Sequence, residues 1–303
     1  MTKVKLVVVA VLMSALWSVG ATAKFNIFAC EPEWGALAKE ITGNKAKIYV
    51  ATGPNQDAHY IRAKPSLIAK IRIADLVFCT GAELEIGWLP VLLNKAGKTS
   101  VQPGEVGMLF AADYVDKLEI PAVVDRQQGD VHPSGNPHIQ LDPRNFLPVA
   151  RELASRLTRL DSKSAPIFAG NLESFEKSWQ KSIDRWQLAA SDLRGRKVVV
   201  YHRQWSYLLD WLDIISIADV EPKPGVPPSG KHLVDTITVI EQKNPFGILY
   251  SSFAITGPVT WLQQNTEIAA VELPGTLGGV PGTDTLPALF EVIIGRLNDA
   301  AAQ

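Results

Sequence analysis

The sequence predicts an α/β protein of two lobes, each built around a parallel sheet and joined by one long rigid helix. Short apolar runs alternate with helical patterns before residue 160 and again after residue 196, which is typical of βα units. The tract between them is amphipathic and long enough to form a single helix. A chain of 303 residues also has room for two ordinary domains. We therefore expect a lobe at 24–163, a linking helix at 164–195 and a second lobe at 196–303.

In the first lobe, helical patterns follow apolar runs. Trp34, Leu37 and Ile41 recur at helical spacing, and Gly43 ends that pattern. Pro65 is a typical opening residue for the next helix. The expected strands are 25–29, 46–52 and 75–81, and the expected helices are 32–42, 65–74, 83–97 and 143–161.

The linking tract carries Phe175, Trp179, Ile183 and Trp186 at steps of three or four residues, and Gly195 ends it. The alternation of apolar runs and helical patterns then resumes. It continues through the segments 197–202, 205–213, 215–230, 232–244, 246–252, 256–265, 268–275 and 286–299.

The N-terminus has the layout of a secretory signal peptide. Lys3 and Lys5 precede an apolar run of about 14 residues, and Ala21-Thr22-Ala23 forms a small-x-small cleavage site. The run is shorter than the ~20 residues that span a bilayer. We expect a signal peptide at 1–23, cleavage near Ala23 and a soluble protein exported to the periplasm.

The chain contains two cysteines, Cys30 and Cys79, and each follows an apolar run. An even count in an exported protein suggests one disulfide, with two buried thiols as the alternative. Cys30 would also suit a lipoprotein, but Lys24 and Asn26 interrupt the apolar run before it. The 30 basic and 31 acidic residues nearly balance, so we expect no nucleic-acid partner.

Three histidines lie where α/β proteins place ligands, in loops that we expect just beyond strand ends. These residues are His59, His138 and His202, and no local zinc motif accompanies them. A single histidine in a loop is more often a surface residue than a ligand, but three in equivalent loops make a site assembled by folding as plausible as three surface residues.

The other two histidines are expected to play lesser roles. His132 lies in a loop rich in Gly and Pro, where we expect it to be solvated or to brace the loop, and His232 is expected to cap a helix or face solvent. The carboxylates form no convincing catalytic pair, and the sequence has neither a nucleophile elbow nor a phosphate loop. Asp57 or Asp142 is expected to orient an imidazole.

Four stretches together resemble the metal-binding periplasmic solute-binding proteins of ABC importers, in particular their zinc-specific branch. They are "DAHYIRAKPS", "ADLVFCTGAELEIGWLP", "GNPHIQLDPRN" and "EPKPGVPPSGKHL". The resemblance spans the mature chain, and it implies that His59, His138 and His202 hold Zn²⁺ between the lobes. The family's Asp-Pro-His motif is Asp57-Ala58-His59 here, and the His-rich acidic loop of many zinc members is missing from the sequence.

The resemblance implies capture of zinc in the periplasm, delivery to an ABC permease in the inner membrane and no enzymatic reaction. A periplasmic metallochaperone is an additional candidate partner, and we expect a monomer. The family commonly adds an acidic fourth ligand from the second lobe, for which Glu272 is preferred narrowly over Asp284, with water as a further alternative.

Three neutral imidazoles and one oxygen suit tetrahedral zinc, whereas manganese prefers more oxygen ligands. Three alternative functions remain at this point. They are a secreted zinc-dependent hydrolase that uses the same histidines, a binding protein for manganese or another divalent metal, and an adhesin of the same fold.

Overall fold

The computed structural model describes residues 25–123, 129 and 132–303. The expected signal peptide at 1–23 lies outside the described residues. Within the part of the chain that is described, no helix is both long enough and apolar enough to cross a membrane.

The first lobe contains a parallel sheet of four strands in the order β2-β1-β3-β4. These strands are β1 (Phe25–Ala29), β2 (Ala46–Val50), β3 (Leu76–Cys79) and β4 (Met108–Phe110). Its helices are α1 (Pro32–Thr42), α2 (Pro65–Ile73), α3 (Leu89–Ala96) and α4 (Phe146–Leu160). Phe28 in the central strand pairs with Tyr49 on one side and Val77 on the other.

The second lobe repeats this arrangement, with parallel strands in the order β6-β5-β7-β8. These strands are β5 (Lys197–Val200), β6 (Ile215–Asp219), β7 (Ile248–Ser251) and β8 (Ala270–Leu273). Its helices are α6 (Ser206–Leu212), α7 (Gly230–Lys243), α8 (Gly257–Thr266) and α9 (Leu286–Ala301). The predicted fold class, two βα lobes with parallel sheets, is confirmed.

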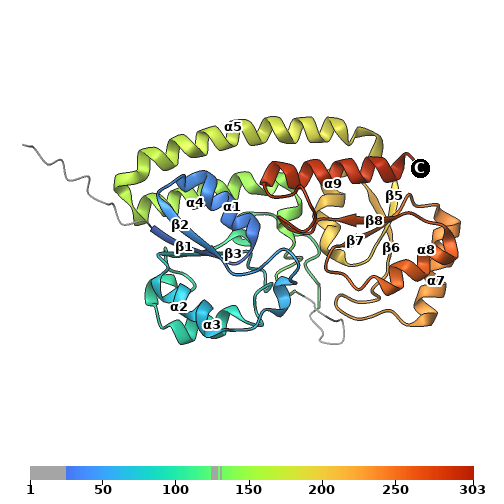
Figure 1. Ribbon diagram of the computed structural model, residues 1–303, viewed down its shortest axis with the longest axis horizontal. Coiled ribbons are helices and arrows are strands. Elements are labelled where there is room, and N and C mark those ends of the chain that lie inside the picture. Colours follow the sequence, from blue (N-terminus) through green and yellow to red (C-terminus); the bar gives the residue numbers. More distant parts are fainter. Residues whose placement is uncertain (1–24, 124–128, 130–131) are drawn as a thin grey trace, which may run out of the picture.

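The helix α5 (Ala165–Ala189) runs along both lobes and packs against α4, α1 and α9 (Figure 1). Its apolar stripe is largely aromatic, as the spacing predicted. Trp179 and Trp186 are buried, and both rings contact Phe290 of α9, while Trp179 also contacts Phe146 of α4. One apolar cluster therefore continues from the first lobe into the second. This shared core opposes a large hinge motion between the lobes.

Two local features differ from the sequence-based expectation. The helix predicted at 83–97 begins only at Leu89, because Ala82 and Glu83 adopt positive φ angles of 46° and 62° and the chain turns there. The strand β4 has only three residues, too few to stand out as an apolar run.

Candidate metal centre

Three histidines from separate loops meet between the lobes, beyond the carboxyl ends of the strands. His59 lies in the short helix η1 (Ala58–Tyr60) after β2, His138 precedes η5 (Ile139–Leu141), and His202 follows β5. The ring centroids of His59 and His138 are 5.4 Å apart, those of His138 and His202 5.6 Å, and those of His59 and His202 6.4 Å. The fold thus brings together the three imidazoles that the sequence analysis singled out.

Two of these imidazoles are oriented by a carboxylate. The Nδ1 atom of His59 lies 2.6 Å from Oδ1 of Asp57, and the Nδ1 atom of His202 lies 2.7 Å from Oε2 of Glu221. An Nδ1–H that donates to a carboxylate leaves the lone pair on Nε2 available for a metal. Burial acts to raise the pKa of Asp57, but the hydrogen bonds and charge of His59 outweigh it and lower that pKa.

Glu221 is a residue of this candidate site that the sequence analysis missed. It follows β6, which is hydrogen-bonded to β5, so the parallel register places Glu221 beside the chain that carries His202. An acidic residue at the end of a neighbouring strand was the signal that could have identified it. Of the two acids expected to orient an imidazole, Asp57 does so, whereas Asp142 binds the guanidinium of Arg144 with an N–O distance of 2.7 Å.

His138 is the most buried of the three histidines, with 9% of its surface exposed. Burial first, and then the neighbouring His59, His202 and His132, hold its pKa well below the usual range, so the ring is neutral and carries a lone pair. Its Nε2 atom is buried and has no hydrogen-bond partner among the described residues. A buried nitrogen that lacks a hydrogen-bond partner in this way is well suited to bind a metal ion.

Asn136 ties the loop of His138 to the second lobe. Its Oδ1 atom accepts a hydrogen bond from the backbone N–H of His138 at 2.9 Å, and its Nδ2 atom donates to the carbonyl oxygen of Arg203 at 2.8 Å. The hydroxyl of Tyr207 donates to the carbonyl oxygen of Asn136 at 2.7 Å. The Asn-Pro-His sequence therefore fixes His138 relative to the segment that follows His202.

His132 also reaches the cluster, which differs from the solvated or bracing role expected for it. Its Nε2 atom lies 3.1 Å from Nε2 of His59, and the two ring centroids are 5.2 Å apart. The position follows from a tight local turn, since the N–H of Gly135 donates to the carbonyl oxygen of His132 and Gly135 has a φ of 107°. His132 thus lies on the same side of the cluster as His59.

The other candidate residues lie outside the contacts of this cluster. His232 is near the start of α7, with Nε2 placed 2.9 Å from the carbonyl oxygen of Asp219. Glu272 lies on β8, with Oε2 placed 3.3 Å from Nη1 of Arg296, and Asp284 is exposed before α9. Neither acid lines any of the described cavities that the histidines border.

Three cavities meet at His138. One of about 480 Å³ is also bordered by His132 and His202, one of about 270 Å³ by His59 and His202, and one of about 40 Å³ by His59. The imidazoles therefore border three cavities of different size, and the smallest of them is the one lined by His59 and His138.

The structure joins Cys30 and Cys79 in the expected disulfide, which links the ends of adjacent strands β1 and β3 with a Cα–Cα distance of 4.7 Å. Both cysteines are completely buried, so Cys30 is not a lipid attachment site in this fold. Together with Glu85 they form the one group of three His, Cys, Asp or Glu residues in the described chain whose ligand atoms all lie within 4.8 Å of one another. Because the sulfurs are bonded to each other, that group holds no metal in this state.

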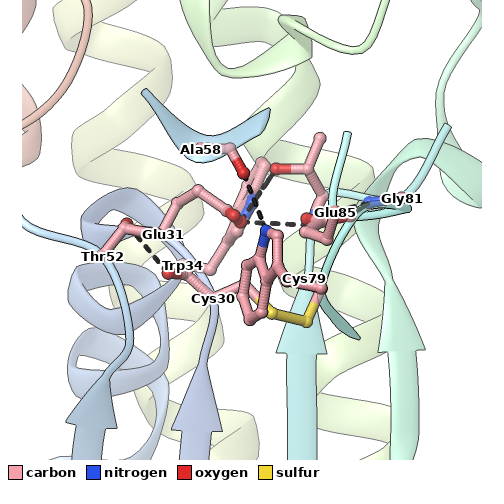
Figure 2. The surroundings of a disulfide bond; sticks show 10 residues. Cys30, Glu31, Trp34, Thr52, Ala58, Cys79, Gly81 and Glu85 are labelled. Carbon is pink, nitrogen blue, oxygen red and sulfur yellow. Dashed lines mark hydrogen bonds between the residues drawn. A yellow bond between two sulfur atoms is a disulfide. The ribbon is translucent and has the colours of Figure 1, made fainter. Parts of the chain in front are cut away.

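Two buried acids, Glu31 and Glu85, point toward one another beside the disulfide (Figure 2). The Oε2 atom of Glu31 accepts from the hydroxyl of Thr80 at 3.0 Å, and Oε1 of Glu85 accepts from the backbone N–H of Thr80 at 2.7 Å. Burial raises the pKa of Glu85 to about 7, and burial together with the nearby Glu85 charge raises the pKa of Glu31 well above its usual range. At least one proton is therefore shared within this pair near neutral pH.

A pair of βα lobes on a helical spine, with a polar site built from loops between them, defines the class of solute-binding proteins. Residues 27–300 match the model of the family described as ZnuA, zinc-uptake complex component A, periplasmic, and the chain belongs to that family. This membership confirms the expectation of a transport component and not an enzyme.

Curated relatives include two streptococcal lipoproteins. The metal ABC transporter substrate-binding lipoprotein FimA of Streptococcus parasanguinis is 24% identical over 60% of this chain and 57% of its own length. The manganese ABC transporter substrate-binding lipoprotein PsaA of Streptococcus pneumoniae is 25% identical over 54% of this chain and 51% of its own length. The alignments thus span somewhat more than half the length of these relatives.

Solved structures share the fold over nearly the whole chain. A crystal structure of ZnuA has a TM-score of 0.77 at 19% identity, and covers 92% of this chain and 100% of its own. The manganese-bound S38A mutant of a periplasmic metal-binding protein from Candidatus Liberibacter asiaticus has a TM-score of 0.76 at 17% identity, with the same coverage.

Proposed function

We propose that this protein captures one Zn²⁺ ion between its lobes in the periplasm and delivers it to an ABC permease in the inner membrane. The observation that carries this proposal is the meeting of His59, His138 and His202 between the lobes, with carboxylates bound to Nδ1 of two of them. The two carboxylates occupy the Nδ1 atoms of His59 and His202, which leaves their Nε2 lone pairs available, as metal-ligating histidines require. A metallochaperone is an additional candidate partner, and the expected species is a monomer.

Zinc is preferred over manganese because of the donor set. Nitrogen atoms of neutral imidazoles suit Zn²⁺ at about 2.0–2.1 Å in a tetrahedral arrangement, whereas Mn²⁺ prefers a larger share of oxygen. The relatives include a manganese ABC transporter substrate-binding lipoprotein, so the preference for zinc over manganese is the part of the proposal to measure first.

We propose His132 as the fourth ligand in place of Glu272. The Nε2 atoms of His132 and His59 already lie 3.1 Å apart, close to the separation of two ligands on one tetrahedral ion. Glu272 instead faces Arg296, which would have to release it before it could bind a metal. Asp284 stays the competing oxygen ligand, because it is exposed and precedes a helix that borders both lobes.

Only a small movement is needed for capture. The ligand atoms of His59, His138 and His202 do not all fall within 4.8 Å of one another, whereas nitrogens on one zinc ion lie about 3.3 Å apart. The shared aromatic core along α5 restricts the lobes to shifts of this order. Metal binding is thus expected to draw the loops inward without a large domain closure.

Titration of the metal-free mature protein with Zn²⁺ and Mn²⁺ tests this function. We expect one equivalent of Zn²⁺ to bind reversibly, to be removed by a chelator and to displace Mn²⁺ in competition. Tighter binding of Mn²⁺ would assign the protein to manganese. Turnover of ester or peptide substrates by the zinc-loaded protein would instead support the hydrolase alternative.

A further inference from the structure

Different helices cover the two faces of the first sheet. Helices α1 and α4 lie on the side of α5, whereas α2 and α3 lie on the opposite side (Figure 1). The α2–α3 layer packs on its own apolar cluster, which includes Phe28, Val77 and Trp88. The outer side of this layer is therefore a surface of the first lobe that faces away from α5.

Positive charge is concentrated on the α2–α3 layer. Residues 60–74 and 86–104 contain the two helices and their flanking loops, and they include six Lys or Arg but no Asp or Glu. The whole chain has a net charge of −1, so this excess of one sign is local. The six residues, all exposed except the half-buried Lys98, form what we call the basic surface: Arg62, Lys64, Lys70, Arg72, Lys95 and Lys98.

Neighbouring acids leave most of this charge unpaired. Among the six cations, and within the described part of the chain, only Lys98 forms an ion pair, with its Nζ atom 3.9 Å from Oδ1 of Asp75. The Nη2 atom of Arg72 donates instead to the backbone carbonyl oxygen of Lys95 at 3.0 Å, which joins α2 to α3 without neutralising the guanidinium. The basic surface thus presents its charge to an external partner.

Exposed apolar side chains lie on the same helices. Ile73 at the end of α2 is 55% exposed, and Val91 of α3 is 44% exposed. Ile73 is three residues after Lys70 and Val91 is four residues before Lys95, so each shares a helical face with a cation. Positive charge beside exposed apolar side chains is typical of surfaces that bind an anionic bilayer.

We propose that the basic surface binds the anionic phospholipid headgroups of a membrane. An acidic protein is the alternative partner, but four of the six cations are lysines, which are depleted in protein–protein interfaces. A layer of lipid phosphates attracts lysine and arginine alike. The proposal uses no metal ligand and therefore stands apart from the zinc site. Together with the proposed function, it would keep the protein close to the permease.

Cosedimentation of the zinc-loaded mature protein with lipid vesicles tests this surface. One set of vesicles contains phosphatidylglycerol mixed with phosphatidylcholine, and the other contains phosphatidylcholine alone. We expect binding to the anionic set at low salt, and release at about 1 M salt, where the Debye length is about 3 Å. The proposal is wrong if the anionic vesicles bind no protein at low salt, or if both sets bind it equally.

A triple variant assigns the binding to the basic surface. It replaces three of the exposed lysines: Lys64→Gln, Lys70→Gln and Lys95→Gln. One cation near an anionic surface strengthens binding by about fivefold, so we expect this variant to bind anionic vesicles at least about tenfold more weakly. Thermal unfolding and zinc titration check that it is folded and functional.

The matched control makes the same change of net charge on the side of α5. It replaces three other exposed lysines: Lys163→Gln, Lys177→Gln and Lys181→Gln. We expect the control to bind anionic vesicles as the wild type does. An equal loss in the two triple variants would show that net charge, and not the basic surface, governs binding, and would contradict the proposal.

Inorganic phosphate separates a layer of headgroups from a discrete phosphate site. At matched ionic strength, we expect phosphate to release no more protein from the anionic vesicles than chloride does, because many weak contacts share the binding. Complete release by phosphate under these conditions would identify a discrete anion site and overturn the proposal. Because zinc affinity is measured separately, failure of the membrane proposal leaves the proposed zinc site to its own test.

Discussion

The Nε2 atoms of His59 and His132 lie 3.1 Å apart, although 73 residues separate them in the sequence. His59 is held by Asp57 through its Nδ1 atom, so its Nε2 atom faces His132 as an acceptor in the neutral tautomer. In the absence of metal, His132 must then be the donor. For both Nε2 atoms to bind one cation, the proton of His132 must move from Nε2 to Nδ1, which leaves a lone pair on each Nε2.

Replacing His132 is therefore expected to weaken zinc binding. We expect the dissociation constant of His132→Ala to rise at least about tenfold, which is ~1.4 kcal/mol, because one nitrogen ligand is lost. Competition with a chromophoric chelator measures the change. Glu272→Gln is the matched comparison and should bind zinc as the wild type does, since its partner is Arg296. If zinc affinity falls strongly in Asp284→Asn and does not change in His132→Ala, the fourth zinc ligand is Asp284 and not His132.

The carboxylates that hold Nδ1 are expected to affect affinity without touching the metal. Asp57→Asn and Glu221→Gln should each weaken zinc binding about 10–100-fold, because the amides no longer fix the ring tautomer or increase the basicity of the ligand. Calorimetric titration gives the affinity and the stoichiometry, which should stay at one. Glu173→Gln, an acid-to-amide change at an exposed position, is the control. Unchanged affinity in both variants would mean that the two carboxylates do not orient ligands.

Asn136 is expected to matter for both stability and affinity. Asn136→Ala removes hydrogen bonds to His138 and Arg203 and leaves a buried backbone N–H without its acceptor, at a cost of about 1–3 kcal/mol. Urea unfolding of the metal-free protein measures the loss. Because the loop of His138 is also released, zinc affinity should fall in parallel. A destabilised variant with full zinc affinity would show that the loop finds its position without this link.

The buried acid Glu85 is expected to make stability depend on pH. Its pKa is about 7 in the folded protein, against about 4.3 for an exposed glutamate. Between these values the folded state keeps a proton that the unfolded state has released, so stability falls as pH rises through this window, by up to about 4 kcal/mol. Urea unfolding at pH 4.5, 6 and 8 in a chelator should show a weaker fall for Glu85→Gln than for the wild type. If wild type and Glu85→Gln show the same dependence of stability on pH, Glu85 is not the group responsible for it.

Much of the fold could be predicted from the sequence, because apolar runs and helical spacing directly reflect burial. Trp179 and Trp186 marked the buried face of α5, and the runs that end near Cys30 and Cys79 marked the adjacent strands that the disulfide joins. The start of α3 was misplaced because positive φ angles at Ala82 and Glu83 have no clear signal in a sequence. The lobe boundaries at 163 and 195 stay predictions.

The site was harder to predict in full. Strand-end loops drew attention to His59 and His202, but the position of His132 depends on a turn at Gly135 and on where two distant loops meet. The pairing of Glu31 with Glu85 could not be predicted, because their burial beside the disulfide follows from the packing of β1 against β3, which no local pattern encodes. Glu221 was missed for a similar reason, since only the sheet register brings it to His202.

The central claim is that one zinc ion binds between the lobes on His59, His138 and His202. The most direct measurement is anomalous diffraction at the zinc absorption edge from crystals of the zinc-loaded protein. The account predicts an anomalous peak about 2.0–2.1 Å from the Nε2 atoms of all three histidines. A zinc peak at another place, with these three imidazoles unbound, would contradict it.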